Sequence, residues 1–200
     1  ADILKVQYDN NPRQIELLTD IVDSTKELNN FITSILDLTK IESRELALKL
    51  ESKDVNPLIE STVNGLRFEA AAKEMKIELN LAPLYPIKVD TNLINRVFGN
   101  IIGNAIKYAG HGKQIKITTE DDEKWVYITI EDDGKGISQE DLDNIFEKFY
   151  RVKDDESHKI KGSGLGLYLV KYFIELHQGM ISVESNLNEG TKFLIKLKNE

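Results

Sequence analysis

Two hundred residues allow one large domain, or a helical segment plus one domain of ordinary size, and a formal charge of −8 without a basic stripe argues against nucleic-acid binding. No apolar run approaches about 18 residues, so the sequence predicts no membrane-spanning helix, and its start shows no signal-peptide pattern. The absence of cysteine excludes disulfides, thiolate metal sites and a cysteine nucleophile, and it fits a reducing cytosol.

The first 46 residues have the pattern of a helical segment. Residues 1–8 look like the last turns of one helix, and Asn11-Pro12 signals the start of another, because asparagine caps free N–H groups and proline has none to lose. A helix to about Ser43 follows, with a seam at steps of three and four: Leu18, Ile21, Thr25, Leu28, Ile32, Ile35 and Thr39. Further apolar residues widen this seam and favour a four-helix bundle. We expect a homodimer through this helix in the full-length protein, the alternative being a helix that packs on its own domain.

The rest of the chain alternates between strand and helix patterns. We expect strands over 46–50, 76–81, 87–89, 114–119, 125–132, 181–184 and 191–197, and helices over 54–74, 91–108, 164–177 and shortly after Ser138. Asp90 or Thr91 is the expected cap of the helix over 91–108. The order predicts an α+β fold, a two-layer α/β sandwich in which a mixed sheet packs on about three helices, preceded by the long helix.

The predicted helix 91–108 carries two asparagines on one face. Asn100 and Asn104 are four residues apart, and Lys107 follows about one turn later. Two amide oxygens aimed together suit Mg²⁺, which prefers oxygen ligands and takes others from phosphates and water, and the lysine would meet phosphate charge. Taken alone, the pair equally fits a solvated helix face.

A carboxylate and two glycines follow the predicted strand 125–132. Asp132 at the strand end can accept a hydrogen bond from an exocyclic amine, and Gly134 and Gly136 let the backbone turn tightly and approach a ring closely. The alternative is an ordinary turn between a strand and a helix, where aspartate and glycine are common.

Two further patterns flank a charged loop over residues 152–163. Before it, Phe146 and Phe149 would anchor one end of the loop on the core while Lys148 and Arg151 point toward a phosphate, or the aromatics are an ordinary core patch. After it, the glycines of residues 162–166 open a helix and free its N–H groups for an anion. No Gly-Lys-Ser/Thr follows and no strand precedes, which disfavours a P-loop and a dinucleotide fingerprint.

In this order and spacing the four patterns carry a resemblance to a known family. From about Asp54 to Lys198 the chain resembles the catalytic, ATP-binding domain of sensor histidine kinases, in the superfamily that includes gyrase-type ATPases (the GHKL or Bergerat superfamily), and the patterns match its N, G1, F and G2 boxes. Residues 174–179, 184–185 and 190–193 fit its closing segment. The helix over 13–43 is similar to the second helix of the family's dimerisation and phosphoacceptor hairpin. The implied domains are a partial hairpin over 1–46 and an ATP-binding catalytic domain over 47–200.

The resemblance implies roles for single residues. Asp132 would bind the adenine amine, supported by Thr191 through water. Asn100 and Asn104 would hold Mg²⁺, Lys107 and Arg151 would contact phosphate, and Tyr108 would line the base pocket. The full implied ATP-binding set is Asn100, Asn104, Lys107, Tyr108, Asp132, Gly134, Gly136, Ile137, Tyr150, Arg151, Gly162, Ser163, Gly164, Leu165, Gly166, Leu167 and Thr191.

The implied reaction is in-line transfer of the γ-phosphoryl group of ATP to a histidine, for relay to a response regulator. The family's acceptor motif, a histidine followed by an acidic residue, is missing, and the chain begins without an initiator Met. We therefore expect the acceptor upstream of Ala1, and we expect this chain alone to bind ATP but not to autophosphorylate. His111, in a turn, His158, in the charged loop, and His177, where a helix end suits a histidine, are poor substitutes.

Two other functions stay open from the sequence. One is a non-catalytic signalling module in which nucleotide occupancy only changes how the domain packs on its helices. The other is a Ser/Thr kinase or gyrase-type ATPase on the same fold, which the F-box pattern and the preceding hairpin helix disfavour. The resemblance implies a cytoplasmic domain, with or without a membrane anchor elsewhere in the parent protein.

Overall fold

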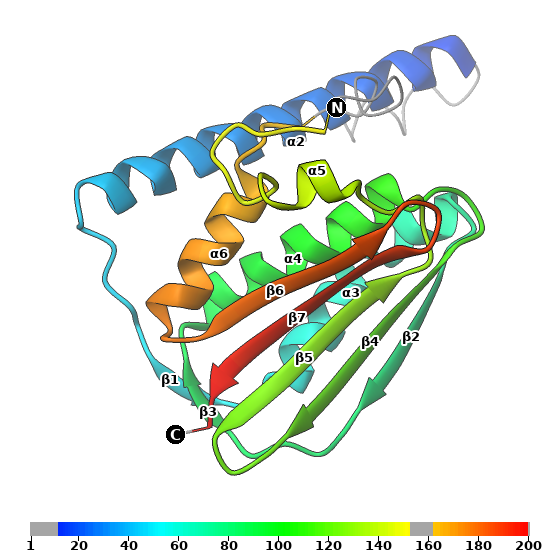
Figure 1. Cartoon of the computed structure of the whole chain (residues 1–200). Coiled ribbons are helices and arrows are strands. Elements are labelled where there is room, and N and C mark those ends of the chain that lie inside the picture. Colours follow the sequence, from blue (N-terminus) through cyan, green and yellow to red (C-terminus); the bar gives the residue numbers. More distant parts are fainter. Residues whose placement is uncertain (1–11, 153–161, 200) are drawn as a thin grey trace. The chain divides into compact units, whose positions relative to one another are not determined.

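The computed structural model describes residues 12–152 and 162–199 and divides into two compact units (Figure 1). One unit comprises the chain through Leu46 with residues 162–163, and the other comprises the rest. No helix within the described ranges is long and apolar enough to cross a membrane. The predicted helical turns of residues 1–8 and most of the charged loop lie outside the described residues. The assignment of residues 1–46 to a hairpin and 47–200 to a catalytic domain stays a prediction.

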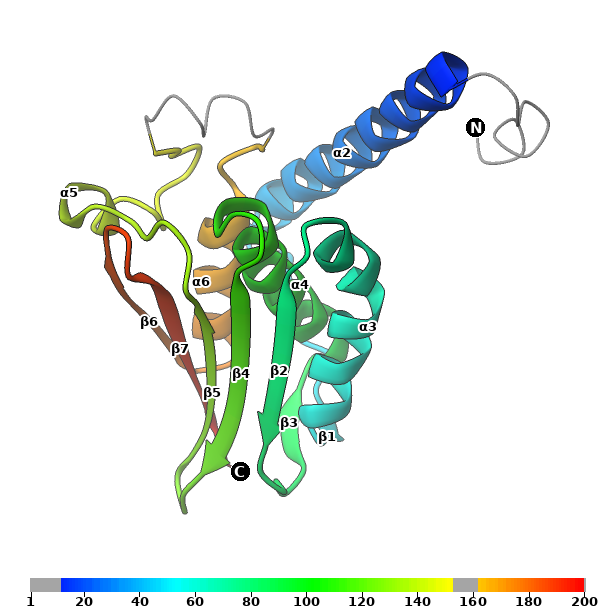
Figure 2. The same ribbon diagram turned by 90° about the vertical axis from the view of Figure 1, so that its right-hand side faces the viewer.

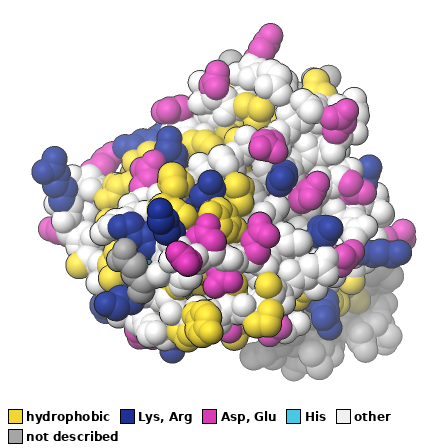
Figure 3. All heavy atoms as spheres, turned by 60° about the horizontal axis from the view of Figure 1, so that its bottom comes forward, with side chains coloured by type: hydrophobic (Ala, Val, Ile, Leu, Met, Phe, Trp, Pro, Cys, Tyr) yellow, Lys and Arg dark blue, Asp and Glu magenta, His cyan; other side chains and the backbone are white. Residues whose placement is uncertain are grey.

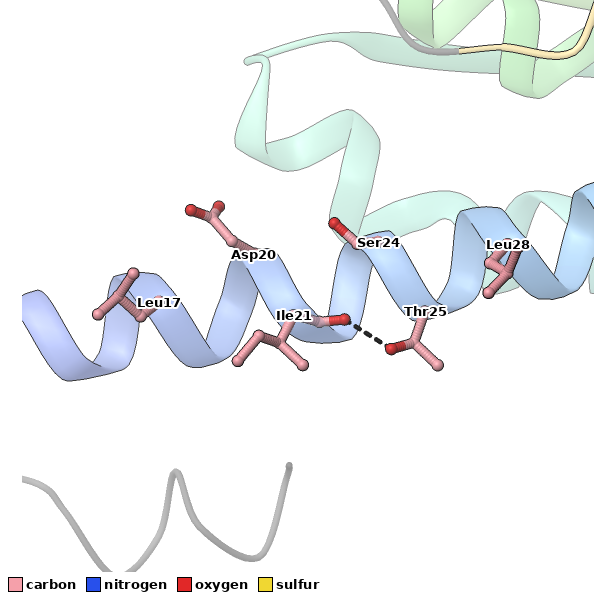
Figure 4. Close-up of a pocket in the computed structure, with 6 residues that line it drawn as sticks. All are labelled: Leu17, Asp20, Ile21, Ser24, Thr25 and Leu28. Atoms are coloured by element: carbon pink, nitrogen blue, oxygen red, sulfur yellow. Dashed lines mark hydrogen bonds between the residues drawn. The ribbon is translucent and has the colours of Figure 1, made fainter.

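In the part of the chain that the structure describes, the first unit contains one long helix, α2 (Pro12–Glu42), which begins at the predicted proline. Threonine fits inside it because the Thr19 and Thr25 hydroxyls donate to the carbonyl four residues earlier, at 2.8 and 2.7 Å. Several large apolar side chains along it are exposed, namely Leu17, Ile21, Leu28, Phe31, Ile32 and Leu36. Figure 4 shows a shallow hollow that Leu17, Ile21 and Leu28 line. Dimerisation through this helix stays a prediction.

The second unit is built on a five-stranded sheet in the order β2-β4-β5-β7-β6 (Figure 1). Its strands are β2 (Lys76–Leu81), β4 (Gln114–Asp121), β5 (Trp125–Asp132), β6 (Met180–Asn186) and β7 (Gly190–Lys198). The β2–β4 pair is parallel and the other neighbouring pairs are antiparallel, so the sheet is mixed, as predicted.

Three helices cover one face of this sheet, α3 (Asn56–Ala72), α4 (Thr91–Tyr108) and α6 (Gly166–Leu176), and a one-turn helix, α5 (Gln139–Leu142), follows β5 (Figure 2). The core lies between the two layers, because alternate strand residues such as Ile128 and Ile130 are buried, as are Phe98 and Ile102 of α4. The fold is the predicted α+β sandwich preceded by a long helix.

The other face of the sheet carries a row of alternating charges. Register partners across the five strands are Glu78, Lys116, Glu131, Lys192 and Glu184. Lys192 Nζ lies 3.8 Å from the Glu184 carboxylate, and opposite charges on neighbouring strands stabilise a sheet. Figure 3 likewise shows basic and acidic side chains interspersed on the side that it displays. The charges of this row therefore offset one another.

One predicted strand is wrong. The side-chain alternation of residues 46–50 predicts a strand there, but the structure has β1 at Glu51–Lys53. This strand pairs antiparallel with β3 (Ile87–Val89) in a separate two-stranded sheet, with Glu51 opposite Val89. Because a strand exists only where a neighbouring backbone satisfies its hydrogen bonds, the three residues of β3 set where β1 lies.

A buried hydrogen-bonded link joins the start of α4 to the end of α6. The Asp90 carboxylate caps α4, as predicted, by accepting from the N–H groups of Asn92 (3.1 Å) and Leu93 (3.2 Å). The Asp90 N–H donates to His177 Nε2 at 2.9 Å, and His177 Nδ1 lies 2.6 Å from the Phe173 carbonyl. Since a carbonyl only accepts, Nδ1 carries the ring proton and Nε2 has none. His177 thus lies at the C-terminal cap of α6, the helix end predicted for it, and its Nδ1–H group donates to a carbonyl of the last turn.

Candidate nucleotide-binding site

One end of the helix-covered face of the sheet is polar. Asp132, Thr191 and Ser185 are register partners across β5, β7 and β6, and Ile115 of β4 lies beside Asp132 in the same row. Thr191 and Ser185 are buried, and Asp132 is half-buried. The adjacent row toward the core is entirely apolar, consisting of Ile117, Ile130, Phe193 and Val183. The register therefore places one carboxylate and two hydroxyls side by side, next to an apolar row on the same face of the sheet. We call Asp132, Thr191 and Ser185 the polar row.

The Asp132 carboxyl is electrostatically unusual. Burial raises its pKa from 3.8 to about 6, and the nearby charges of Asp133 and Glu131 act in the same direction. Hydrogen bonds from the N–H groups of Gly134, at 2.9 Å, and Thr191 oppose this rise. Perturbed carboxyls cluster at functional sites, and at pH 7 this one is mostly ionised and acts as a hydrogen-bond acceptor.

Close backbone contacts explain the glycines around this row. A Cβ at Gly134 would lie 2.3 Å from Ala109 Cα, where the end of α4 meets the turn after β5. Gly136 has φ +70°, and a Cβ there would lie 1.9 Å from the Asn186 carbonyl oxygen. The turn after β5 thus packs directly on the β6–β7 hairpin, and the role of these glycines in shaping a pocket stays a prediction.

Asn100 of α4 faces the start of α6. Its Nδ2 donates to the Arg96 carbonyl at 2.8 Å, and a Cβ at Gly166 would lie 2.7 Å from its Oδ1. The amide is therefore turned with its oxygen toward the helix start. An amide oxygen in that orientation fits a hard divalent cation such as Mg²⁺. Asn104 lies one turn further along α4, and its part in a metal site stays a prediction.

The N-terminus of α6 is suited to an anion. Leu165 precedes the helix and offers no side-chain cap, so the first N–H groups are not capped by that residue. Lys148 Nζ lies 5.1 Å from the ring centroid of Tyr168 in the first helical turn, which brings a positive charge to this end. A helix dipole and a nearby ammonium group both favour negative charge.

Phe149 is placed differently from the prediction. Its side chain is 56% exposed, so it does not anchor the loop on the core, and its backbone has φ +63°, which is strained for a bulky residue. Gly164, with φ +71°, packs on it, since a Cβ there would lie 2.7 Å from the Phe149 carbonyl carbon. Phe146 is half-buried, with Lys171 Nζ 5.7 Å from its ring centroid.

The end of α4 gathers positive charge. Lys107 is exposed, and its carbonyl accepts from Lys73 Nζ at 3.0 Å. Burial, followed by the charge of Lys107, lowers the pKa of Lys73. Lys135 Nζ lies 5.9 Å from the ring centroid of Tyr108, which places that ring beside the turn after β5. The contact of Lys107 with phosphate and of Tyr108 with a base stays a prediction.

The remaining predicted residues are less closely grouped. The Tyr150 hydroxyl donates to Asp141 of α5 at 2.6 Å, so it supports the segment before the charged loop. Gly162 and Ser163 belong to the compact unit of α2, and their part in the site stays a prediction. The nucleotide contacts expected of Arg151 and of Leu165 and Leu167 stay predictions too.

Sequence reasoning missed the residues that hold the turn after β5. Asp133 Oδ1 accepts from the Gln114 N–H at 2.7 Å, which ties the turn to the start of β4. Gln139 Nε2 donates to the Ser185 carbonyl at 2.9 Å, and Ser185 Oγ accepts from the Ile137 N–H at 2.8 Å. No local pattern marks these contacts, because they join segments up to 48 residues apart.

Metal ligands other than asparagine are scarce here. The described ranges contain no group of three or more His, Cys, Asp or Glu side chains that could hold a metal ion. A divalent cation at this site would therefore depend on the Asn100 amide oxygen and on the phosphates of a ligand. Among the described residues, those that line the hollow along α2 all belong to that helix and do not include Asn100 (Figure 4).

The fold is an α+β sandwich, and one end of its helix-covered sheet face carries the row of Asp132, Thr191 and Ser185. Residues 89–200 match the family described as "Histidine kinase-, DNA gyrase B-, and HSP90-like ATPase". That match covers more than half of the chain, so the chain belongs to this family.

Relatives and solved structures agree with this assignment. Sensor protein RprX of Bacteroides fragilis is 34% identical over 191 residues, which is 94% of this chain but only 37% of RprX. Full-length histidine kinase ShkA in complex with AMPPNP superposes with a TM-score of 0.78 at 22% identity, over 94% of this chain and 39% of ShkA. Histidine kinase ThkA in complex with response regulator TrrA gives 0.72 at 22% identity, over 99% and 55%. The structures support the fold, and RprX points to the sensor-kinase branch of the family.

Proposed function

We propose that this chain binds ATP with Mg²⁺ as the catalytic domain of a two-component sensor histidine kinase, and that it transfers the γ-phosphoryl group to a histidine outside the chain. The observation that carries the proposal is the polar row. An ionised Asp132 carboxylate, which can accept further hydrogen bonds, lies beside an apolar row and next to a turn whose glycines allow close backbone approach. A purine with an exocyclic amine matches that combination of shape and hydrogen bonding.

The other half of the site suits a phosphate chain. Asn100 turns its amide oxygen toward the start of α6, and Lys148 adds a positive charge near the same helix end. Asn100, with Asn104 one turn later, would hold Mg²⁺, which would neutralise phosphate charge when bound. Lys107 and the N–H groups at the start of α6 would position the phosphates, and catalysis would rest on positioning and charge neutralisation.

The described histidines are poor phosphate acceptors. Both ring nitrogens of His177 are engaged in buried hydrogen bonds, so neither can attack a phosphoryl group without breaking the link between α4 and α6. His111 lies in an exposed turn after α4, without a carboxylate pattern that would activate it. His158 lies outside the described residues. We therefore assign the acceptor to the longer parent protein.

A response regulator is the proposed consumer of the phosphoryl group, and the exposed apolar side chains of α2 would pair with a second copy in the parent protein. The complex of ThkA with a response regulator supports such a partner for a protein of this fold. ATP and these regulators are cytoplasmic, so we place the domain there, with an anchor elsewhere in the parent protein left open.

The second candidate is a signalling module that binds nucleotide without transferring phosphate. The observation that favours it is the absence of a suitable acceptor among the described histidines. The two candidates differ in one result: incubation of the parent protein with γ-radiolabelled ATP yields an acid-labile phosphohistidine only if the domain is a kinase.

Calorimetric titration with ADP and ATP, with and without Mg²⁺, tests nucleotide binding. We expect saturable binding that Asp132→Asn weakens by at least about a hundredfold, because the substitution replaces an ionised acceptor with an amide. Glu131→Gln is the matched control, since it removes a neighbouring carboxylate from the other face of the same strand. A chain that binds neither nucleotide contradicts the proposal.

A further inference from the structure

Ser185 on the edge strand β6 has a hydrogen-bond partner for its proton and for each lone pair of its hydroxyl. Its Oγ lies 2.6 Å from the Gly190 carbonyl oxygen, 2.8 Å from the Ile137 N–H donor atom and 3.0 Å from Thr191 Oγ1. The side chain is buried, with 8% of its surface exposed. Residues 184–185 belong to the closing segment of the family resemblance, but the implied ATP-binding set does not include Ser185.

The direction of each hydrogen bond follows from counting protons. Ser185 has one hydroxyl proton, and the Gly190 carbonyl at 2.6 Å can only accept, so the proton goes there. The Ile137 N–H can only donate, so it uses a lone pair of Ser185. The contact with Thr191 is then a hydrogen bond only if Thr191 donates its own hydroxyl proton to Ser185.

Ser185 therefore controls what Thr191 can offer to a ligand. With its proton committed to Ser185, the Thr191 hydroxyl has only lone pairs left. Asp132, its register partner on β5, is an acceptor too when ionised, and the Thr191 and Gly134 N–H groups are already bonded to its carboxylate. The row thus presents acceptors side by side and no free side-chain donor.

We propose that Ser185 is a positioning residue for base selection: by taking the proton of Thr191 it turns the polar row into an acceptor-only surface that selects a purine carrying a 6-amino group and rejects a 6-oxo purine. This inference rests on the proposed nucleotide binding and deepens it. An adenine amine brings two N–H donors to the row. A hypoxanthine or guanine oxygen in the same place would face acceptors only, and unpaired polar groups of that kind give strong discrimination.

The same hydroxyl fastens the turn that carries Asp132 to the β6–β7 hairpin. Ser185 Oγ accepts from the Ile137 N–H of this turn. A second bond between the turn and the hairpin runs from the Asn188 N–H to the Lys135 carbonyl at 2.7 Å. A loss of Ser185 could therefore act through a displaced turn as well as through Thr191. Only an effect through Thr191 predicts a change in base preference that depends on the Thr191 hydroxyl. Such a change therefore distinguishes a positioning role of Ser185 from a structural one.

Calorimetric titration of the 200-residue chain with ADP and with inosine diphosphate measures base preference directly, because the two ligands differ at position 6 and in the N1 proton. We expect the unaltered chain to prefer ADP by about a hundredfold or more. Ser185→Ala should narrow that preference by about tenfold, the effect of roughly one hydrogen bond. Ser185→Thr, which keeps a hydroxyl, should restore most of it.

Two further variants make the test decisive. Ser182→Ala removes an exposed serine of the same strand and should leave the preference unchanged. Thr191→Val should narrow the preference as Ser185→Ala does, and adding Ser185→Ala to Thr191→Val should narrow it little further, because both act through one hydroxyl. If Ser185→Ala does not fold, as thermal unfolding monitored by circular dichroism would show, Thr191→Val carries the test.

The outcomes separate this inference from the function on which it rests. An unaltered chain that binds no ADP overturns both. A chain that binds ADP, but whose preference over inosine diphosphate is the same in Ser185→Ala or Thr191→Val, overturns the role of Ser185 alone. Equal weakening of both ligands in Ser185→Ala, with the preference kept, would likewise assign this serine to structure only.

Discussion

At the scale of single residues, the charge of Asp132 couples nucleotide binding to pH. Burial raises the pKa of this carboxyl from 3.8 to about 6, and its ionised form is the acceptor that the proposed base contact needs. We expect ADP affinity to rise with pH up to about 7 and then to level off, because the fraction of ionised carboxylate follows that course. Calorimetric titrations between about pH 5 and pH 8 would check this, and an affinity that falls with rising pH would contradict it.

The raised pKa of Asp132 also lowers the stability of the ligand-free fold once the carboxyl is ionised. A carboxyl with a higher pKa in the folded chain than in the unfolded chain binds its proton more tightly when folded. Stability therefore falls as the pH rises from about 4 to about 6, by an amount on the order of 3 kcal/mol. Asp132→Asn should remove this slope and raise the melting temperature at pH 7, although it weakens nucleotide binding. A variant less stable than the parent at pH 7 would argue against a buried ionised carboxylate.

Alanine substitutions at two glycines distinguish the cost of a positive φ from the cost of a steric clash. Gly136 and Gly112 have nearly the same φ, +70° and +68°, but a Cβ at Gly136 would lie 1.9 Å from the Asn186 carbonyl whereas Gly112 has open space around it. Gly112→Ala should cost about 1 kcal/mol through φ alone. Gly136→Ala should cost several kcal/mol, on the order of 3 or more, and should weaken ADP binding. Denaturant unfolding and calorimetry measure the two effects, and equal costs would show that the turn moves freely off the hairpin.

At the scale of elements, the cap of α4 connects three parts of the fold. The Asp90 carboxylate accepts from the N–H groups of Asn92 and Leu93 and also from that of Lys49, at 2.9 Å. Asp90→Ala should destabilise the domain by about 2–3 kcal/mol, because it leaves buried N–H groups without partners. Asp143→Ala, at an exposed position after α5, is the control and should cost little. A loss below about 0.5 kcal/mol for Asp90→Ala would mean that water replaces the cap.

Most helix and strand bounds of the second unit could be read from local pattern. The helix α4 runs over the predicted residues because an aspartate cap precedes an apolar face repeating at three and four residues. The strands β2 and β5 also match the predicted ranges. The strand β1 does not, since its place depends on the three residues of β3, which lie more than 30 positions away in the sequence.

At the scale of the whole molecule, the second unit has a core of its own. Its fully buried side chains come from both layers, among them Ile94 and Phe98 of α4, Ile128 of β5 and Phe173 of α6. We expect a chain that starts at Ala47 to fold cooperatively and to bind ADP within about threefold of the complete chain, because all strands and three covering helices remain. Thermal unfolding and calorimetry would check this. A truncated chain that aggregates or loses ADP binding would show that the two units are one domain.

The sequence by itself determined the α+β fold, the family and the positions of Asn100, Asp132 and the glycines, because these depend on periodicity, caps and motif spacing within short segments. Only the tertiary structure decided how they act. The strand register places Thr191 between Ser185 and Asp132, burial raises the pKa of the Asp132 carboxyl, and the Asn100 amide oxygen faces Gly166 at the start of α6. The pairing of Asp132 with Thr191 and the approach of Gly166 to Asn100 join segments far apart in the chain, and hydrogen bonding and desolvation there depend on three-dimensional neighbours that no local pattern records.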